Sequence, residues 1–334
     1  MMTTTPARFN AFRIHDDAAG YRSGIEQIAL DDLAPGEVVI RAEYSSVNFK
    51  DALAGTGKGK ILRKAPLVGG IDVAGRVVAS TDPLYREGDA VLATGSGLSE
   101  TRDGGYSEYV RLPAQWTIAL PDGLSLRESM ILGTAGFTAA LALLRMEENR
   151  QAPALGPLAV TGATGGVGSL AVAIFARAGY QVSAISGKPE ADAYLRELGA
   201  HEVLGRDALS TTRPMDTARF GGGLDNVGGP MLAALLAHTA PYGNVATAGL
   251  AASPDLHATV MPFIIRGVSL LGVASAGTAR DIRDEVWRRL AADWKPATLE
   301  RICTREATLS DLPDVFDKML AGGSFGRTLV RLTS

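Results

Sequence analysis

A glycine-rich turn, Ala163-Thr164-Gly165-Gly166-Val167-Gly168, contains the residues of this chain whose identity and spacing most clearly indicate a chemical role. A short apolar run, 158–160, precedes this turn, and an apolar periodic stretch, 170–178, follows it. Strand, glycine-rich turn and helix in this order are the context in which a dinucleotide-binding fingerprint becomes informative. Gly165 lets the backbone approach a pyrophosphate closely, and the N–H groups at the helix N-terminus can bind its oxygens. The turn therefore predicts a nucleotide site.

The end of the next expected strand, 181–185, indicates which nucleotide binds. A site for NAD usually carries Asp or Glu at this point, where the carboxylate accepts from the ribose 2′-OH. This chain has Ser186, Gly187 and Lys188 instead, and the first carboxylate is Glu190. A hydroxyl and an ammonium group suit a 2′-phosphate, because both donate hydrogen bonds to it. The segment favours NADPH, and the alternative is a polar loop that opens the next helix.

Two patterns of elements surround these residues. Up to about residue 123, β-rich segments alternate with Gly- and Pro-containing turns, which predicts a small β-barrel-like domain. From residue 156, strands and helices alternate, which is typical of a parallel sheet covered on both faces. The expected strands of the first part are 7–14, 37–47, 71–79, 89–93 and 107–112, and the segment 299–304 is also expected to be a strand.

Composition limits the classes of function. The chain has 334 residues, enough for two domains, and 46% of them are hydrophobic. A net charge of −3 gives no reason to expect a nucleic acid or an anionic membrane as partner. Apolar stretches are interrupted before the roughly 20 residues needed to span a bilayer, and no apolar segment lies near the N-terminus. We expect a cytoplasmic protein.

Cysteine and histidine usage argues against a metal. Cys303 is the only cysteine, which excludes an internal disulfide and a multi-cysteine zinc site. The four histidines have no spacing typical of metal ligands. We expect no bound metal.

Further motifs resemble those of a known family. The fingerprint 161–168 resembles that of the medium-chain dehydrogenase/reductase superfamily, and 44–51 and 69–75 resemble its N-terminal motifs. The segments 133–138, 260–266 and 326–330 match as well. Together they are similar to the zinc-independent acryloyl-CoA reductase branch, also called the YhdH-type quinone oxidoreductases, over essentially the whole chain.

This resemblance implies an α/β fold with a GroES-like β-barrel domain and a Rossmann domain whose parallel sheet is doubly wound. The GroES-like domain would cover 1–123, completed by 297–334, and the NADPH-binding Rossmann domain would cover 124–296. Zinc-dependent members carry Cys where Asn48 stands and a His-Glu pair near Ile71 and Asp72, so the resemblance implies a zinc-free reductase. It also makes a homodimer plausible, with the edge strand near 269–273 as a contact.

The resemblance implies cofactor contacts residue by residue. Tyr44 matches a position at the nicotinamide end, and Arg206 matches a second cation beside the 2′-phosphate. The remaining matched positions are Thr164, Gly165, Gly166 and Val167 at the pyrophosphate, Ser186, Gly187 and Lys188 at the 2′-phosphate, and Leu250, Ile264 and Ser275 along the adenine and nicotinamide channel.

The implied reaction is the NADPH-dependent reduction of acryloyl-CoA to propionyl-CoA, by hydride transfer to the β-carbon and protonation of the α-carbon. Catalysis then needs a hydrogen-bond donor at the thioester oxygen and a proton source. We expect Asn48 to donate its amide N–H to the developing oxyanion. Asp51 would orient a neighbour or a water, or serve only as a helix cap or turn residue, and Tyr44 is a competing proton donor.

A basic run, Lys58-Gly59-Lys60-Ile61-Leu62-Arg63-Lys64, could meet the phosphates of coenzyme A, although such a run is more often a solvated loop. Two other functions remain open. One is reduction of quinones or enones on the same fold, and the other is binding of NADPH without catalysis.

Overall fold

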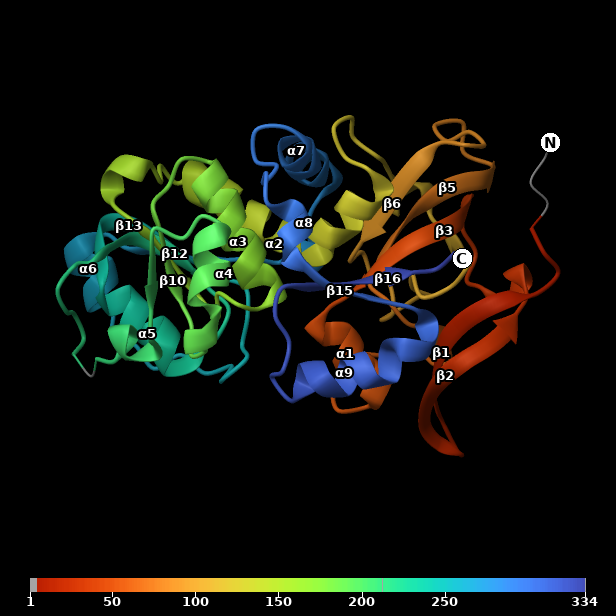
Figure 1. Cartoon of the computed structure of the whole chain (residues 1–334), viewed down its shortest axis with the longest axis horizontal. Helices are drawn as coiled ribbons and strands as arrows, with labels where there is room; N and C mark the ends of the chain where they lie inside the picture. Colours follow the sequence, from red (N-terminus) through yellow and green to blue (C-terminus); the bar gives the residue numbers. More distant parts are fainter. Residues whose placement is uncertain (1–4, 212, 334) are drawn as a thin grey trace. The chain divides into compact units, whose positions relative to one another are not determined.

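The computed structural model describes residues 5–211 and 213–333. The chain forms two compact units (Figure 1). Unit 1 comprises Met1–Thr134, Ala276–Asp284 and Cys303–Ser334, and unit 2 comprises Ala135–Ser275 and Glu285–Ile302. The domain boundary expected after residue 123 therefore falls inside unit 1.

Unit 1 is built mainly on antiparallel strands, as alternating β-rich segments and turns predict. Its strands are β1 (Phe9–Asp17), β2 (Gly20–Ile28), β3 (Val38–Val47), β4 (Leu67–Val68), β5 (Asp72–Ser80), β6 (Ala90–Thr94), β7 (Tyr109–Leu112), β8 (Ile118–Ala119), β15 (Cys303–Ala307) and β16 (Arg327–Arg331). A larger sheet has the order β15-β16-β3-β5-β6-β8, with β7 paired to β3, and a smaller sheet has the order β2-β1-β4.

The C-terminal segment completes the larger sheet of unit 1. Strand β16 runs antiparallel to β3, with Thr328 opposite Val47, and β15 runs parallel to β16. The segment 299–304, expected to be a strand, begins instead as the short helix α8 (Leu299–Ile302), and the strand starts only at Cys303. That prediction was wrong for 299–302, because a single helical turn carries too few residues to show a helical period.

The core of unit 1 is rich in aromatic side chains, which bury large apolar areas. Phe12 and Phe316 are 1% exposed, and their ring centroids lie 5.8 Å apart in an edge-to-face arrangement. Phe316 belongs to α9 (Leu312–Leu320), which packs on α1 (Phe49–Thr56). This core fixes α1, and α1 carries two of the expected catalytic residues near its start.

Unit 2 is a six-stranded parallel sheet with the order β11-β10-β9-β12-β13-β14. The strands are β9 (Leu158–Thr161), β10 (Val182–Ile185), β11 (Glu202–Leu204), β12 (Phe220–Asp225), β13 (Thr239–Thr247) and β14 (Ser269–Gly272). The helices between them are α3 (Gly166–Arg177), α4 (Asp192–Glu197), α5 (Gly229–Ala237) and α6 (Met261–Arg266). Right-handed crossovers place α3 and α4 on one face of the sheet and α5 and α6 on the other.

This strand order is that of a doubly wound dinucleotide-binding sheet, and it reverses between β9 and β12. Ligands of such sheets bind at the carboxyl ends of the strands beside this reversal. Every residue of β9, β10 and β12 is buried. The expected α/β fold, with a GroES-like domain and a Rossmann domain, is therefore confirmed.

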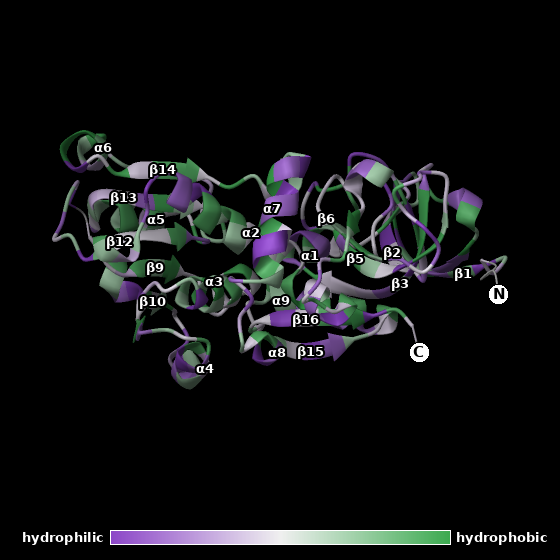
Figure 2. Ribbon diagram, turned by 90° about the horizontal axis from the view of Figure 1, so that it is seen from above, coloured by the Kyte–Doolittle hydropathy of each residue, from purple (hydrophilic) through white to green (hydrophobic). Residues whose placement is uncertain are grey.

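Helices α2 (Leu126–Glu148) and α7 (Arg280–Ala291) have residues in both units. Within residues 5–211 and 213–333, α2 alone is long and apolar enough to cross a membrane by length and composition, which the sequence analysis did not anticipate. Its most apolar window is 89% buried, as in the core helix of a globular protein. Helix α7 is instead largely hydrophilic (Figure 2).

Candidate functional site

The glycine-rich turn lies at the carboxyl end of β9 and leads directly into α3, whose N-cap is Gly165. A Cβ atom added to Gly168 would lie 2.2 Å from the carbonyl oxygen of Gly162, so only glycine lets the helix pack this closely on the turn. The first N–H groups of α3 have no acceptor within the helix, and such groups bind phosphates. The helix N-terminus brings together Thr164, Gly165, Gly166 and Val167.

The carboxyl ends of β9 and β12 are joined by side chains at the point where the strand order reverses. Thr161 Oγ1 donates to Asp225 Oδ1 at 2.7 Å, and Asn226 Nδ2 donates to the carbonyl of Thr161 at 2.9 Å. The N–H of Gly228 donates to Asp225 Oδ2 at 2.6 Å. Burial raises the pKa of Asp225, while these hydrogen bonds oppose that rise. The strand ends are thereby held in a fixed geometry.

A cationic loop follows β10. The N–H of Ser186 donates to the carbonyl of Leu204, and Ser186 Oγ accepts from the N–H of Lys188 at 3.0 Å. A Cβ atom added to Gly187 would lie 2.4 Å from Arg206 Nε, so the guanidinium of Arg206 lies directly against this glycine. The structure therefore groups a hydroxyl, a lysine and an arginine at adjacent strand ends, a donor set that fits a phosphate.

A hollow of about 270 Å³ opens beyond the ends of β13 and β14. Its lining includes Leu250 and Val273, together with polar residues from the 247–255 segment. Among the described residues that line it, neither Ile264 nor Ser275 appears. Ile264 is 76% exposed on α6, and Ser275 is half-buried in a single 3-10 turn. Of the three expected channel residues, the structure places only Leu250 on this hollow.

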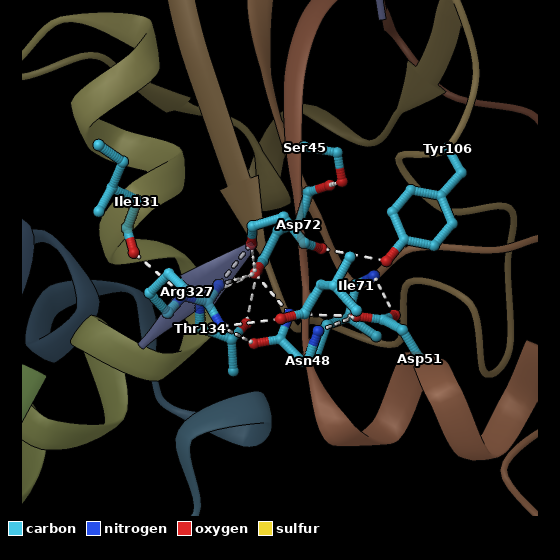
Figure 3. A network of polar contacts seen from close by, with 11 residues as sticks. Ser45, Asn48, Asp51, Ile71, Asp72, Tyr106, Ile131, Thr134 and Arg327 are labelled. Atoms are coloured by element: carbon cyan, nitrogen blue, oxygen red, sulfur yellow. Dashed lines mark hydrogen bonds and ion pairs between the residues drawn. The ribbon is translucent and has the colours of Figure 1, made fainter. Parts of the chain in front are cut away.

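In unit 1, Asn48 is the N-cap of α1 and Asp51 lies in its first turn. Asp51 Oδ2 accepts from the backbone N–H of Asn48 at 2.8 Å and from Asn48 Nδ2 at 3.1 Å, and Asp51 Oδ1 accepts from the N–H of Ile71 at 2.9 Å (Figure 3). Burial raises the pKa of Asp51 to about 7, and the nearby charge of Asp72 adds to that rise. The carboxyl therefore titrates near neutral pH.

The amide of Asn48 is fully engaged by protein groups. Its Nδ2 donates to Asp51 and, at 2.7 Å, to Asp72 Oδ2, while its Oδ1 accepts from Arg327 Nη1 at 3.1 Å. An amide has two hydrogens to donate, so none is left for a substrate oxyanion in this arrangement. The expectation that Asn48 donates to the oxyanion is not supported by this geometry, and Asn48 acts here as a link between two carboxylates.

Asp72 lies at the centre of this network (Figure 3). It is fully buried, and its carboxylate accepts from Ser46 Oγ at 2.6 Å, from Thr134 Oγ1 at 2.6 Å and from the N–H of Thr134 at 3.0 Å. Arg327 Nη2 lies 3.7 Å from Asp72 Oδ2, and Arg327 is 2% exposed. Burial lowers the pKa of Arg327, and the charges of Asp72 and Asp51 oppose that change.

Sequence reasoning missed Asp72, Thr134 and Arg327 as site residues. The signal was present, because each lies in a motif that carries the family resemblance: 69–75, 133–138 and 326–330. The motif 44–51 contributes Asn48 and Asp51 to the same network. The sequence marks these motifs, but only the folded structure shows that they meet in one buried polar cluster.

Tyr44 is half-buried on β3, where it pairs with Ala74 of β5 and Arg331 of β16. Side chains alternate along a strand, so Tyr44 is on the same face of β3 as Ser46, whose hydroxyl binds Asp72. The phenol is thus carried by the strand that the network anchors.

The donor set around Asn48 does not fit a zinc ion. Zn²⁺ takes three or four thiolate, imidazole or carboxylate ligands. The carboxylates of Asp51 and Asp72 are the only groups of this kind that contact Asn48 among the described residues. The oxygens of Asp72 already accept hydrogen bonds from Ser46, Asn48 and Thr134, and they lie beside the guanidinium of Arg327. Over residues 5–211 and 213–333, no group of three or more His, Cys, Asp or Glu is arranged to hold a metal.

Two family models match the chain in the order of its domains. The alcohol dehydrogenase GroES-like domain matches residues 34–122, and the zinc-binding dehydrogenase domain matches residues 166–292. The second model carries zinc in its name, but the residues around Asn48 do not provide a zinc site.

Full-length relatives are similar to this chain. The putative quinone oxidoreductase YhfP of Bacillus subtilis is 44% identical over 97% of this chain and 99% of its own length. The acrylyl-CoA reductase AcuI of Ruegeria pomeroyi is 43% identical over 96% of this chain and 98% of its own length.

A solved structure is also similar to this chain over nearly its full length. The YhdH oxidoreductase of Salmonella enterica, in complex with NADP, superposes with a TM-score of 0.93 at 42% identity, covering 97% of this chain and all of that one. The chain therefore belongs to the medium-chain dehydrogenase/reductase superfamily, in the branch that contains the acrylyl-CoA reductases and the YhdH-type quinone oxidoreductases.

Proposed function

We propose that this protein reduces the carbon–carbon double bond of acryloyl-CoA to give propionyl-CoA, with NADPH as the reductant. The observation that carries the proposal is the 43–44% identity, over nearly the full length, to relatives named acrylyl-CoA reductase. The Rossmann turn and the cationic loop of unit 2 supply a site that fits the reductant.

NADPH would be held by residues of unit 2 that the structure groups together. The pyrophosphate would bind the N-terminus of α3, where Gly168 leaves no room for a side chain. The 2′-phosphate would bind Ser186, Lys188 and Arg206, which are grouped at the ends of β10 and β11. Bound there, the reduced nicotinamide supplies the hydride that is added to the β-carbon of the substrate.

Addition of hydride to the β-carbon places enolate charge on the thioester oxygen, and the α-carbon must then take a proton. Tyr44 is the better candidate for the proton donor, because its phenol is half-buried and carries an exchangeable proton. Asp51 is 1% exposed and enclosed by Asn48 and Ile71. Its role is to orient Asn48 and the start of α1.

The coenzyme A part of the substrate would meet the basic loop that follows α1. Within this loop Lys58 lies 3.6 Å from Asp317 and Arg63 lies 3.7 Å from Glu100, and both cations are exposed, so these ion pairs contribute little. Lys60 and Lys64 are exposed. The loop therefore keeps positive charge available for phosphates.

Reversing charge in the basic loop tests this assignment. Lys60→Glu combined with Arg63→Glu is expected to raise KM for acryloyl-CoA several-fold, with little change in kcat. A small enone without phosphates provides the control, because its KM should not move. An unchanged KM for acryloyl-CoA would exclude the loop as a phosphate site.

The substrate assay separates the three candidate functions. NADPH oxidation is measured with acryloyl-CoA, crotonyl-CoA, free acrylate and a simple quinone, and NADH replaces NADPH in a parallel series. Rapid turnover with acryloyl-CoA, well above that with quinone, supports the proposal. Turnover with quinone alone indicates a quinone oxidoreductase, and binding of NADPH without turnover indicates a protein that is not catalytic.

A homodimer is part of the proposal. Strand β14 ends the sheet of unit 2, and edge strands pair readily with another chain. Exposed apolar side chains lie in the same unit, including Tyr242, Val260, Ile264 and Ile265. Analytical ultracentrifugation of the wild type should give the mass of a dimer. Ile264→Asp combined with Ile265→Asp should shift the protein toward the monomer. A wild type that sediments as a monomer would refute the proposed homodimer. The cytoplasmic location stays a prediction from the sequence.

A further inference from the structure

The buried network of unit 1 ties together three segments that are far apart in sequence. Asp72, at the start of β5, accepts from Ser46 at the end of β3, from Asn48 at the N-cap of α1 and from Thr134 in α2. Because Asp72 is fully buried, each of these hydrogen bonds is shielded from water and is costly to lose. One carboxylate therefore sets the relative positions of β3, α1 and α2 within this unit.

Arg327 completes the cluster from β16. Its Nε donates to the carbonyl of Ile131 at 3.0 Å and its Nη1 to the carbonyl of Val47 at 2.9 Å. Nη2 donates to Ser46 Oγ at 2.6 Å and lies 3.7 Å from Asp72. The guanidinium is thus engaged by backbone on two elements and by the buried carboxylate, which fixes its orientation.

Helix α2 is broken at the point where it meets this cluster. Gly133 has φ 50° and ψ −157°, outside the helical region, and the helix resumes at Thr134. A Cβ atom at residue 133 would lie 2.6 Å from Asp72 Oδ2 and 2.8 Å from Arg327 Nη2. On one side of the break the carbonyl of Ile131 binds Arg327, and on the other side the N–H of Thr134 binds Asp72. Asp72 therefore caps the second part of α2, in the way that a carboxylate satisfies a helix N-terminus.

We propose that Asp72 is a positioning residue for the reaction proposed above. It holds the end of β3, the start of α1 and the break in α2 in one arrangement, with Arg327 as its counter-ion. Tyr44 is on β3, two residues before Ser46, so its phenol takes its orientation from the segment that Asp72 anchors. The inference rests on the proposed function, because the reaction is what the positioning serves.

The test removes single contacts from the cluster. Asp72→Asn keeps the size of the side chain but removes one acceptor and the negative charge. Thr134→Val removes the hydroxyl that binds Asp72 and keeps the backbone N–H. Thr134→Ser is its matched partner, since it restores the hydroxyl. Asp103→Asn is the control for loss of a buried carboxylate in the same unit, because Asp103 accepts from the N–H groups of Ala34 and Val68, outside the cluster.

We expect kcat with acryloyl-CoA to fall at least about tenfold in Asp72→Asn and in Thr134→Val, because displacement of a reacting group by about 1 Å costs up to about a hundredfold. KM and the Kd for NADPH should stay within about threefold. Thr134→Ser should recover most of the rate lost in Thr134→Val, and Asp103→Asn should keep the wild-type kcat. If Asp72→Asn does not fold, the Thr134 pair decides.

A wild-type kcat in folded Asp72→Asn, or in Thr134→Val, would overturn the inference. So would a parallel loss of kcat in Asp103→Asn, because the effect would then follow from any buried carboxylate. Failure of the proposed function looks different: the wild type itself would bind NADPH but would not reduce acryloyl-CoA, and the inference would fall with it.

Discussion

Replacing Asp51 by Asn should change how the stability of the protein depends on pH. Burial, with the charge of Asp72, raises the pKa of Asp51 from 3.8 to about 7. Well below pH 3.8 the carboxyl is protonated in both the folded and the unfolded state, so it does not make stability depend on pH. As the pH rises, the unfolded carboxyl loses its proton first, and the free energy of unfolding falls until the folded carboxyl also ionises near pH 7.

The size of the effect follows from the shift. A shift from 3.8 to about 7 corresponds to roughly 4 kcal/mol in total, of which about 2 kcal/mol is lost between pH 5 and pH 7. In a domain of roughly 150–250 residues, a change of 1 kcal/mol in the free energy of unfolding moves Tm by about 2–4 °C. The expected change in the Tm of the wild type between pH 5 and pH 7 is therefore about 4–8 °C. Asp51→Asn removes the titration, so its Tm should rise relative to that of the wild type by this amount between pH 5 and pH 7.

Thermal unfolding of both proteins at pH 5, 6 and 7 provides the assay. A difference in Tm between the two proteins that is the same at every pH reflects only the hydrogen bonds that the amide cannot accept. Ser129→Ala, which removes a buried hydroxyl bonded to the carbonyl of Leu126, controls for loss of a buried polar group that does not titrate. If the offset between Asp51→Asn and wild type does not change with pH, the description of Asp51 as a carboxyl that titrates near neutrality is wrong.

Two further predictions concern the nucleotide site. Gly168→Ala places a Cβ atom 2.2 Å from the carbonyl oxygen of Gly162, so the turn must open. The Kd for NADPH, measured by fluorescence titration, should then rise at least about tenfold. Gly24→Ala is the control: nothing lies within 4 Å of the added Cβ atom, so this Kd should not change. Gly187→Ala displaces the guanidinium of Arg206, so one charge-assisted contact to the 2′-phosphate, worth about 1.5 kcal/mol, is lost. Calorimetry should therefore show about tenfold weaker binding of 2′,5′-ADP. Binding of 5′-AMP, which has no 2′-phosphate, should not change. Equal weakening of both nucleotides would contradict the assignment of Arg206 to the 2′-phosphate.

Much of the fold could be predicted from local patterns. The alternation of strands and helices after residue 156 predicted the parallel sheet, and the glycine-rich turn was placed correctly at the end of β9 and the start of α3. These features depend on near neighbours in sequence, which periodicity and turn residues report well. The hairpin strand β2 was not predicted, because it is largely exposed and has few apolar residues to set a period.

The polar cluster of unit 1 depends on contacts that no local pattern contains. Arg327 and Val47 are joined by a hydrogen bond although 280 residues separate them. The break at Gly133 lies within an apolar helical stretch, and its cause, the close approach of Asp72 and Arg327, is visible only in three dimensions. The same holds for Asn48, whose amide was expected to be available and is engaged by Asp51, Asp72 and Arg327.

The most direct test of the central claim follows the two hydrogens added to the substrate. The protein is given acryloyl-CoA with NADPH that carries deuterium at the transferred position, and separately with unlabelled NADPH in D₂O; the products are analysed by mass spectrometry and NMR. The account predicts propionyl-CoA with one deuterium on the β-carbon in the first experiment and on the α-carbon in the second. Absence of propionyl-CoA, or deuterium from NADPH at any other position, would contradict it.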